Sequence, residues 1–374
     1  MAQARARDAV AAGAVAVALR RTLVVEADPG PSRPSLVTVV TAELTTIADD
    51  EAVFFDGADI LRYDGLSPDT AYERHGTAFR TLPRPGELLC RFATVNDAHF
   101  GELECGVLEG FDLGPVFSVA DGAEPYPELM NRGAIAEMSA IEPAAVIAKG
   151  DLTTHGTVEE YEAFLAAYAT AFGERLYHVR GNHDGYHGET FASEAPIVVD
   201  VPGVRLAILD TVIPLHTTGQ VTAEQLDWLD SIAAESERPV LVFGHHHPWS
   251  PDSAHREAGY FGINPDDSER LVAVVARRSN ILGYFAGHTH RNRVRQFRAT
   301  GDVPWVEVAC VKDFPGTWAE YRVFEGGILQ IHRRISSADA LAWTEQTREM
   351  FGGLYPSYAF GTLDDRCFAV LPRD

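Results

Sequence analysis

The chain has few cysteines for its length of 374 residues. Its four cysteines, Cys90, Cys105, Cys310 and Cys367, are widely scattered and show no Cys-x-x-Cys spacing. This distribution argues against a disulfide framework and against a thiolate metal site. It favours small buried residues in a reducing compartment, and we therefore expect a cytoplasmic protein.

Basic residues are scarce beside acidic ones. There are 31 lysines and arginines against 54 aspartates and glutamates, and the formal net charge is -23. Nucleic-acid binding draws most of its affinity from Lys and Arg contacts to phosphates. The charge therefore predicts no nucleic acid and no anionic membrane as a bulk partner. A small phosphorylated substrate stays compatible with it, because bound cations reverse the sign of the local field.

Long hydrophobic runs are missing as well. No run approaches the roughly 20 apolar residues of a membrane-spanning helix, so no membrane span is predicted. Near the start, Arg5 and Arg7 precede an apolar stretch over 9–19, which is the order found in a signal peptide. However, Asp8 interrupts this order and no convincing cleavage site follows. We expect residues 1–21 to form a tail or an amphipathic helix, with export as the alternative.

Residues 22–86 are predicted to form a small antiparallel β domain. Short β-rich pieces are separated by turn residues, and no convincing helix intervenes. The phrase over 66–87, LSPDTAYERHGTAFRTLPRPGE, resembles the closing strands of a fibronectin type III-like sandwich followed by a Pro-rich linker. The unit is short for that fold, which implies an incomplete sandwich leaning on the next domain.

Strands and helices alternate from residue 87 to 335. Three segments carry apolar residues at helical spacing: 157–172, 222–234 and 268–278. Thr157 is the expected N-cap of the first segment, and Thr222 with Gln225 has capping-box spacing in the second. Helices between buried strands indicate a layered α/β domain. Strand-like pieces return after residue 290 and predict a second sheet packed on the first, while 336–374 is an extension of unassigned role.

Five short stretches place metal-ligating side chains directly after strand-like apolar runs. They are Asp97-Ala98-His99, Gly150-Asp151, Gly181-Asn182-His183-Asp184, Gly244-His245-His246-His247-Pro248 and Gly287-His288-Thr289-His290. If the runs lie side by side in one parallel sheet, their carboxyl ends meet along the edge where open α/β sheets bind ligands. Each stretch alone is weak evidence, but the five together predict a centre for two divalent cations.

In their order, these stretches resemble the motifs of the calcineurin-like metallophosphoesterase family: D-x-H, G-D, G-N-H-(D/E), H-x-P and G-H-x-H. The resemblance spans about residues 92–290. The pieces GDLTTHG, LDT and QLDWLD are most similar to the branch of class III cyclic-nucleotide phosphodiesterases and glycerophosphodiesterases. The resemblance implies an α/β fold with four layers, in which two mixed β-sheets are flanked by helices.

The resemblance also implies a set of metal ligands. The first ion would take Asp97, His99 and His290, the second would take Asn182, His246 and His288, and Asp151 would bridge both. The family's ligand histidine stands two residues before a proline, which selects His246, with His245 as the alternative. Nitrogen and oxygen ligands without thiolate suit Mn, Fe(II) or Zn. Purple acid phosphatases use a Tyr ligand shortly after the Gly-Asp pair, but 152–155 contains none, so a charge-transfer Fe(III) centre is not expected.

The implied chemistry is hydrolysis of a phosphoester. Two ions can lower the pKa of a water from about 15.7 to about 7 and so supply a bridging hydroxide as nucleophile, with Asp151 as the catalytic bridge. His183 would contact phosphate together with Asn182 and protonate the leaving oxygen; a structural hydrogen bond to Asp97 is the alternative. His247 would lie behind the ligands or reach toward the substrate.

We therefore expect a metal-dependent hydrolase of a small phosphodiester, either a cyclic nucleotide or a glycerophosphodiester. The alternatives are a phosphomonoesterase of the same fold and a non-catalytic interaction protein stabilised by structural metals. The sequence leaves the oligomeric state open, including a homo-oligomer.

Overall fold

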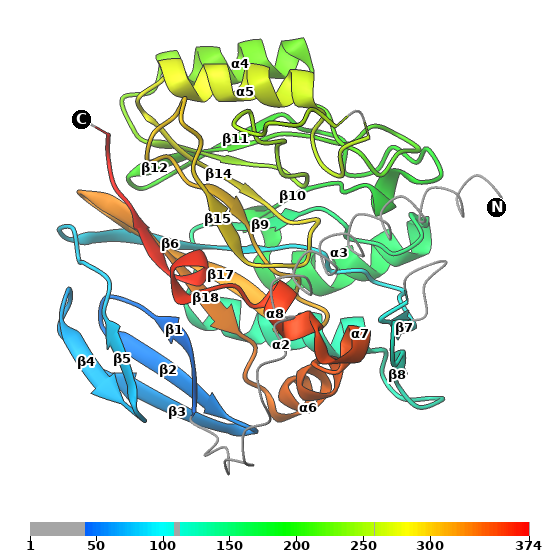
Figure 1. Ribbon diagram of the computed structural model, residues 1–374. Helices are drawn as coiled ribbons and strands as arrows, with labels where there is room; N and C mark the ends of the chain where they lie inside the picture. Colours follow the sequence, from blue (N-terminus) through cyan, green and yellow to red (C-terminus); the bar gives the residue numbers. More distant parts are fainter. Residues whose placement is uncertain (1–41, 108–112, 258, 374) are drawn as a thin grey trace.

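The structure is a computed structural model that describes residues 42–107, 113–257 and 259–373. Its framework is two six-stranded mixed sheets (Figure 1). In the first sheet the order is β10 (Leu176–Val179), β9 (Val146–Lys149), β6 (Leu88–Val95), β17 (Thr317–Phe324), β18 (Gly327–Arg334) and β19 (Phe368–Val370). In the second it is β11 (Ile197–Val201), β12 (Val204–Ile208), β13 (Val240–Phe243), β14 (Ile281–Ala286), β16 (Trp305–Glu307) and β15 (Arg293–Arg295).

The two sheets pack against each other through a shared apolar core. Phe92 and Tyr321 of the first sheet stack with ring centroids 4.4 Å apart. Phe243 of the second sheet meets Phe92 edge-on at 6.1 Å. Strands β13 and β14 are buried along their whole length, as expected for strands that are covered on both faces.

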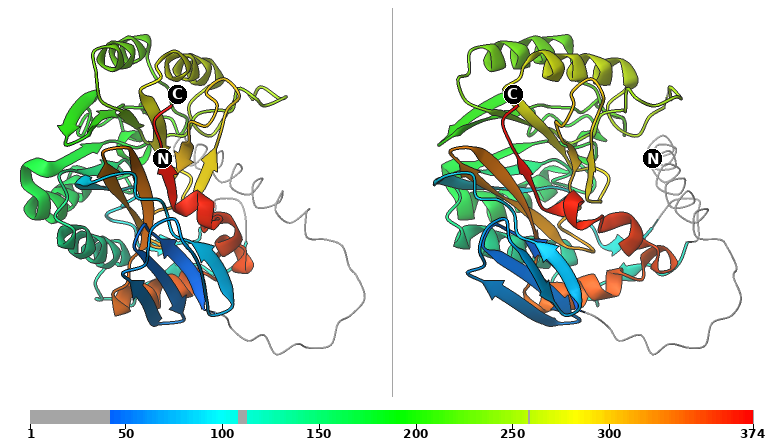
Figure 2. Two further views of the ribbon diagram at one scale, coloured as in Figure 1. Left: turned by 90° about the vertical axis from the view of Figure 1, so that its left-hand side faces the viewer. Right: turned by 60° about the vertical axis from the view of Figure 1, so that its left-hand side comes forward.

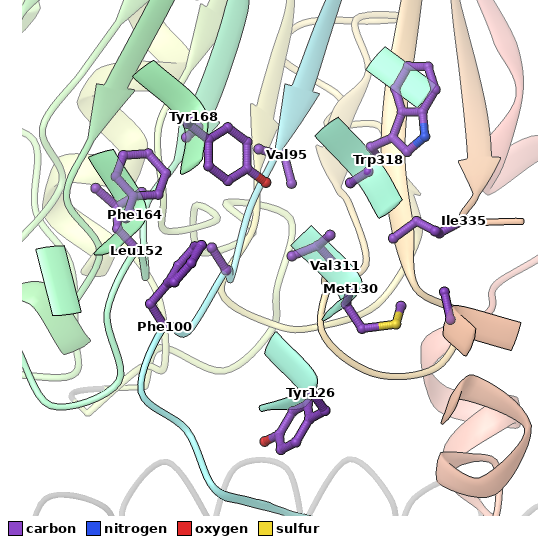
Figure 3. Close-up of a cluster of buried hydrophobic side chains, with 14 of the residues drawn as sticks. Val95, Phe100, Tyr126, Met130, Leu152, Phe164, Tyr168, Val311, Trp318 and Ile335 are labelled. Atoms are coloured by element: carbon purple, nitrogen blue, oxygen red, sulfur yellow. The ribbon is translucent and has the colours of Figure 1, made fainter. Parts of the chain in front are cut away.

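Helices cover both outer faces of the paired sheets, which confirms the predicted arrangement of mixed sheets and helices. Helices α2 (Tyr126–Ala140) and α3 (Val158–Phe172) share a core with the first sheet, and Figure 3 shows Met130 and Phe164 in this core. Helices α4 (Ala223–Ala234) and α5 (Pro265–Arg277) share another core with the second sheet.

The helix starts follow the predicted caps in part. Thr157 and Glu160 form a complete capping box at α3. At α4 the side chain of Thr222 accepts the N–H of Gln225, but the Gln225 side chain donates to the carbonyl of Asp210 instead of closing the box. Helix α5 begins three residues earlier than predicted, because Asn264 provides the cap and Pro265 suits the first turn.

The five motif strands do not lie side by side in one parallel sheet, the condition under which their carboxyl ends were expected to meet. Strands β6, β9 and β10 lie parallel in the first sheet, whereas β13 and β14 lie parallel in the second. The strands after residue 290 are also divided between the sheets. In the first sheet β17 pairs antiparallel with β6 and β18 pairs antiparallel with β17, whereas β16 pairs parallel with β14 in the second sheet.

The described N-terminal strands form a three-stranded antiparallel sheet and a separate hairpin. The strands are β1 (Glu43–Ile47), β2 (Glu51–Asp56), β3 (Asp59–Asp64), β4 (Ala71–Arg74) and β5 (Thr77–Arg80). Phe54 and Phe79 share a core with Leu329 and Ile331 of β18, beside which these strands lie in Figure 2. A fibronectin type III-like sandwich stays unconfirmed, and the tail and the strands predicted before residue 42 lie outside the described residues.

A buried charge network ties these strands to the first sheet. The guanidinium of Arg322 on β17 is within 3.1 Å of carboxylates from Asp49, Asp50 and Glu51 and within 2.8 Å of Glu320. Charges taken out of water need partners at this range to offset their desolvation. The N-terminal strands are therefore joined to the sheet by charge pairing as well as by apolar packing.

The C-terminal extension is built into the fold. It contains α6 (Ala338–Thr347), α7 (Met350–Gly353), α8 (Tyr355–Ala359), α9 (Leu363–Arg366) and β19, which pairs antiparallel with β18. The remaining elements are β7 (Glu104–Cys105), β8 (Phe117–Ser118), η1 (Gly173–Arg175) and η2 (His183–Gly185). The four cysteines are free, and three of them are buried. Among the described residues, no helix has the length and apolar character to cross a membrane.

Candidate metal centre

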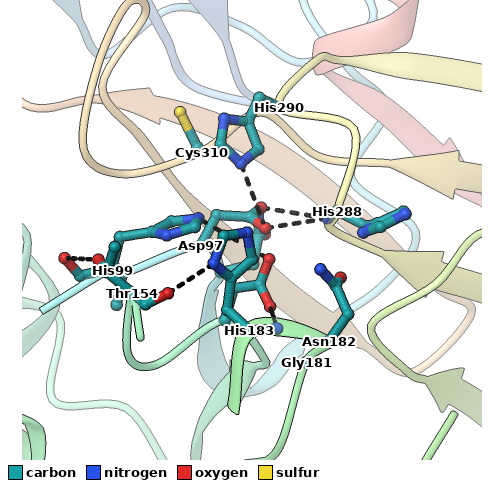
Figure 4. Close-up of polar contacts among 12 residues, drawn as sticks. Asp97, His99, Thr154, Gly181, Asn182, His183, His288, His290 and Cys310 are labelled. Carbon is teal, nitrogen blue, oxygen red and sulfur yellow. Dashed lines mark hydrogen bonds and ion pairs between the residues drawn. The ribbon is translucent and has the colours of Figure 1, made fainter. Parts of the chain in front are cut away.

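The five motif stretches converge where the carboxyl ends of their strands meet. Figure 4 shows residues of three of them, among them Asp97, His183 and His288. Asp97, His99 and His290 bring one ligand atom each to within 4.8 Å of the others. Asp97, Asp151 and His245 form a second such group. Because Asp97 belongs to both groups and Asp151 also forms a group with His99 and His183, the side chains make one continuous cluster rather than two separate sites.

The backbone of this cluster is unusual. Five of the predicted metal ligands adopt left-handed backbone angles: Asp97 (φ 55), His99 (φ 49), Asp151 (φ 48), His288 (φ 68) and His290 (φ 54). Non-glycine residues in this region cost of order 1–3 kcal/mol each and concentrate at functional sites. The surrounding structure therefore holds these side chains in place against a local conformational preference.

Glycine is required beside Asp151. A Cβ on Gly181 would lie 2.2 Å from Oδ1 of Asp151, and a Cβ on Gly150 would lie 2.6 Å from Nδ1 of His245. The absence of a Cβ at Gly181 lets the third motif stretch approach the Asp151 carboxylate closely.

Several ring nitrogens in the cluster lack a hydrogen-bond partner although they are buried. They are both nitrogens of His99 and Nε2 of His288. Nε2 of His99 lies 3.8 Å from Oδ2 of Asp151, and Nε2 of His290 lies 3.6 Å from Oδ1 of Asp97. Buried polar atoms are normally paired. Unpaired nitrogens beside carboxylates are a donor set that fits divalent cations such as Mn, Fe(II) or Zn.

His245 and His246 differ sharply in their surroundings. Nδ1 of His245 donates to the carbonyl of Lys149 at 2.8 Å, and its Nε2 lies 3.1 Å from Oδ1 of Asn182 and 3.2 Å from Oδ2 of Asp151. Its Nε2 thus points at two other predicted ligands. A backbone hydrogen bond on the remote nitrogen is also the usual way in which a metal-binding histidine is oriented.

Both ring nitrogens of His246 instead lie within hydrogen-bond distance of other protein atoms. Nδ1 lies 2.8 Å from the hydroxyl of Thr211, and Nε2 lies 3.1 Å from the carbonyl of Thr217. A carbonyl only accepts hydrogen bonds, so Nε2 carries the proton. Although His246 lies in a group with His245 and His288 whose ligand atoms are within 4.8 Å, its geometry favours a supporting role. The choice between His246 and His245 as the ligand therefore stays a prediction, for which these contacts favour His245.

Burial and charge shift several pKa values here. Burial raises the pKa of Asp151, but the neighbouring histidines, His245 foremost, outweigh it and hold that pKa well below its usual value. Burial lowers the pKa of His245, but the carboxylates of Asp151 and Asp97 outweigh it and raise that pKa to about 9. Burial lowers the pKa of Lys149, whose ammonium donates to the carbonyl of Ala286, to about 7.

The three residues Asn182, His183 and Asp184 make different hydrogen bonds at the site. Nδ2 of Asn182 donates to Tyr186, which turns Oδ1 toward His245. Nδ1 of His183 lies 2.7 Å from the carbonyl of Thr154 and must donate to it, and no hydrogen bond from His183 to Asp97 is present in the described structure. The carboxylate of Asp184 accepts the backbone N–H groups of 152, 153 and 181, so it orients both loops.

A cavity of about 270 Å³ opens beside the cluster. His99, Asp151, Asn182, His183, His288 and His290 line one side. His247 is not one of the described residues that line this cavity. Its buried ring packs against Tyr260 and Phe261. Lys312, Phe351 and Tyr355 also line the cavity. The sequence did not suggest these last residues, because they belong to no motif.

Comparisons with known proteins agree with the motif series. The family model for calcineurin-like phosphoesterases matches residues 90–292. A probable cyclic nucleotide phosphodiesterase of Rhodococcus erythropolis is 29% identical over 196 residues, which cover 49% of this chain and 62% of that protein. A cAMP/cGMP dual specificity phosphodiesterase of Mycobacterium tuberculosis is 26% identical over 219 residues, 56% of this chain and 63% of that protein.

A glycerophosphodiester phosphodiesterase of Enterobacter lignolyticus is also similar. It is 27% identical over 169 residues, which cover 42% of this chain and 59% of that protein. The chain therefore spans about three fifths of the length of these curated relatives.

Proposed function

The chain belongs to the calcineurin-like phosphoesterase family, and from this membership we infer that it is a metal-dependent hydrolase of a small phosphodiester. The observation that carries the proposal is the set of unpaired, buried nitrogens of His99 and His288 beside the carboxylates of Asp97 and Asp151. Buried polar atoms normally have a hydrogen-bond partner, so nitrogens that have none in the protein indicate that a ligand binds to them.

We assign the metal ligands as follows. Asp97, His99 and His290 would hold one ion, Asn182, His245 and His288 would hold the other, and Asp151 would bridge the two. When bound, two divalent cations act as Lewis acids and make hydroxide available near neutral pH by lowering the pKa of water. From the family membership we expect two ions. Metal analysis of the protein would identify them as Mn, Fe(II) or Zn.

The chain's own residues supply binding and proton transfer. Because Nδ1 of His183 donates to the Thr154 carbonyl, its Nε2 is the nitrogen available to the cavity. In the protonated ring this nitrogen can donate to a phosphoryl oxygen and then to the leaving oxygen, a general-acid role worth about 10²–10⁴-fold. The Oδ1 of Asn182 is neutral, so it adds a ligand without cancelling the positive charge that attracts a phosphate ester.

Two features favour a diester over a monoester. The similar proteins are named as cyclic nucleotide and glycerophosphodiester phosphodiesterases. The cavity also continues past the ligand cluster to Met350, Phe351 and Tyr355, which leaves room for a second ester arm.

The proposal is tested with the full chain, metal-stripped and then given Mn²⁺, on bis(p-nitrophenyl) phosphate and on p-nitrophenyl phosphate. We expect turnover of the diester that stops on chelation and returns with Mn²⁺. Preferential turnover of the monoester would favour a phosphomonoesterase. Tight metal binding without turnover of any ester in a panel that includes cyclic nucleotides and glycerophosphodiesters would favour a non-catalytic protein.

A further inference from the structure

Helix α8 of the C-terminal extension lies against the loop that carries His288 and His290. The hydroxyl of Tyr358 donates to the carbonyl of Thr289, the residue between the two histidines, at 2.8 Å. The backbone N–H of Asn292 donates to the carbonyl of Ala359 at 2.9 Å. The loop and the helix are therefore joined at two consecutive residues, the last two of α8.

A second tyrosine of the same helix reaches the other side of His290. The hydroxyl of Tyr355 donates to Oδ1 of Asp313 at 2.7 Å, and the Cys310 thiol lies 2.8 Å from the same oxygen. Oδ2 of Asp313 lies 4.0 Å from Nδ1 of His290 and 3.3 Å from the ammonium of Lys312. Asp313 is thus fixed through one oxygen while the other faces the ring nitrogen of His290 that points away from Asp97 (Figure 4).

The loop needs such support because its two histidines hold left-handed angles, φ 68 at His288 and φ 54 at His290. Residues of this kind stay in place only where the surroundings over-determine them. The hydrogen bond from Tyr358 acts on the peptide between the two histidines, where it can oppose a relaxation of either one.

We propose that Tyr355 and Tyr358 are positioning residues of the metal centre, which hold His288 and His290 in the orientation that binds cations. The inference rests on the proposed function, because it presumes that these histidines are metal ligands. It makes the C-terminal extension part of the centre, although the family model ends at residue 292.

The chemistry of the two phenols suits this role. Burial raises the pKa of Tyr355 well above its usual value, and burial also raises the pKa of Tyr358. Both hydroxyls therefore stay protonated and remain donors at any working pH. Partners that orient metal ligands typically contribute 10–100-fold to metal affinity.

The test uses Tyr355→Phe, Tyr358→Phe and the double variant in the full chain, because phenylalanine keeps the ring and removes only the hydroxyl. Tyr321→Phe is the matched control: its buried hydroxyl donates to Gln330 between strands β17 and β18. Mn²⁺ binding to the metal-stripped proteins is followed by titration calorimetry. Co²⁺ absorption spectra report on the coordination of the bound ion, and urea unfolding of the metal-free proteins reports on the fold.

We expect the double variant to bind both Mn²⁺ ions about 10–100-fold more weakly, because His288 and His290 are assigned to different ions. Its Co²⁺ spectrum should be altered, while Tyr321→Phe binds as the wild type does. Affinities within about twofold of wild type in both single variants and in the double variant would overturn the inference. An equal loss of Mn²⁺ affinity in Tyr321→Phe would also overturn it, since removal of any buried tyrosine hydroxyl would then weaken metal binding. A wild type that binds neither cation would overturn the proposed function together with the inference.

Discussion

Replacing each of two adjacent histidines by alanine gives a direct test of the metal assignment. His245→Ala removes a nitrogen that lies 3.1 Å from Asn182 and 3.2 Å from Asp151. His246→Ala removes a ring whose two nitrogens contact Thr211 and Thr217. Because the two changes delete the same side chain at neighbouring positions, each variant serves as the control for the other.

The two variants are expected to change different quantities: His245→Ala the Mn²⁺ affinity, and His246→Ala the free energy of unfolding. Loss of a ligand should exceed the 10–100-fold effect of a partner that only orients one, so His245→Ala should weaken one Mn²⁺ site by at least about 10³-fold, roughly 4 kcal/mol. His246→Ala loses two hydrogen bonds, each worth about 0.5–1.5 kcal/mol, so its free energy of unfolding should fall by about 1–3 kcal/mol. Its Mn²⁺ affinity should change by less than about tenfold.

The pH dependence adds a second readout. Without metal, the pKa of His245 is about 9, so the ring is protonated at neutral pH and a cation must displace that proton. The apparent Mn²⁺ affinity of the wild type should therefore rise by about tenfold per pH unit between pH 7 and 9. His245→Ala should lose this slope, whereas His246→Ala should keep it.

Calorimetric titration with Mn²⁺ at several pH values, together with urea unfolding in the presence of a chelator, measures both effects. If His246→Ala loses the ion while His245→Ala keeps it, the assignment drawn from these contacts is wrong, and the position two residues before Pro248 is the ligand after all.

Three further outcomes are expected. Asp151→Asn keeps the size of the side chain but removes its charge. Diester turnover should therefore fall by more than the roughly 10²–10³-fold that is lost with a single transition-state hydrogen-bond donor. Turnover near that of the wild type would contradict the assignment of Asp151 as the bridging ligand. His183→Ala should keep both metals and slow esters with poor leaving groups by about 10²–10⁴-fold, whereas equal slowing of good and poor leaving groups would remove the general-acid role. Arg322→Met removes one of the cations that pair with the buried carboxylates of Asp49, Glu51 and Glu320, which keep their contacts to Arg84 and Arg333. It should lower the free energy of unfolding in urea by at most about 3–5 kcal/mol, the cost of breaking a buried pair completely. The control is Arg80→Met, which removes an exposed pair and should leave the unfolding midpoint unchanged.

Much of the local structure could be predicted from the sequence. The apolar runs before the five motifs are strands, and α3 begins after its predicted N-cap, Thr157. These features depend on contacts between residues close in the chain, such as the reciprocal bonds of Thr157 and Glu160. Helix α2 gave no comparable signal: no side chain caps it, and its buried Gly133 lowers the helical propensity of its centre.

The sequence by itself determined which residues gather at the site, because the order of the motifs and their positions after strands is written in the chain. Only the tertiary structure decided how they face one another. Whether His245 or His246 points inward depends on where β13 ends relative to β9, since successive side chains near a strand end point to opposite sides. Likewise, Tyr358 reaches Thr289 and Tyr355 reaches Asp313 only because β18 and the helices after it bring the end of the chain back to this cluster. Contacts between segments so far apart arise from packing, and no local pattern encodes them.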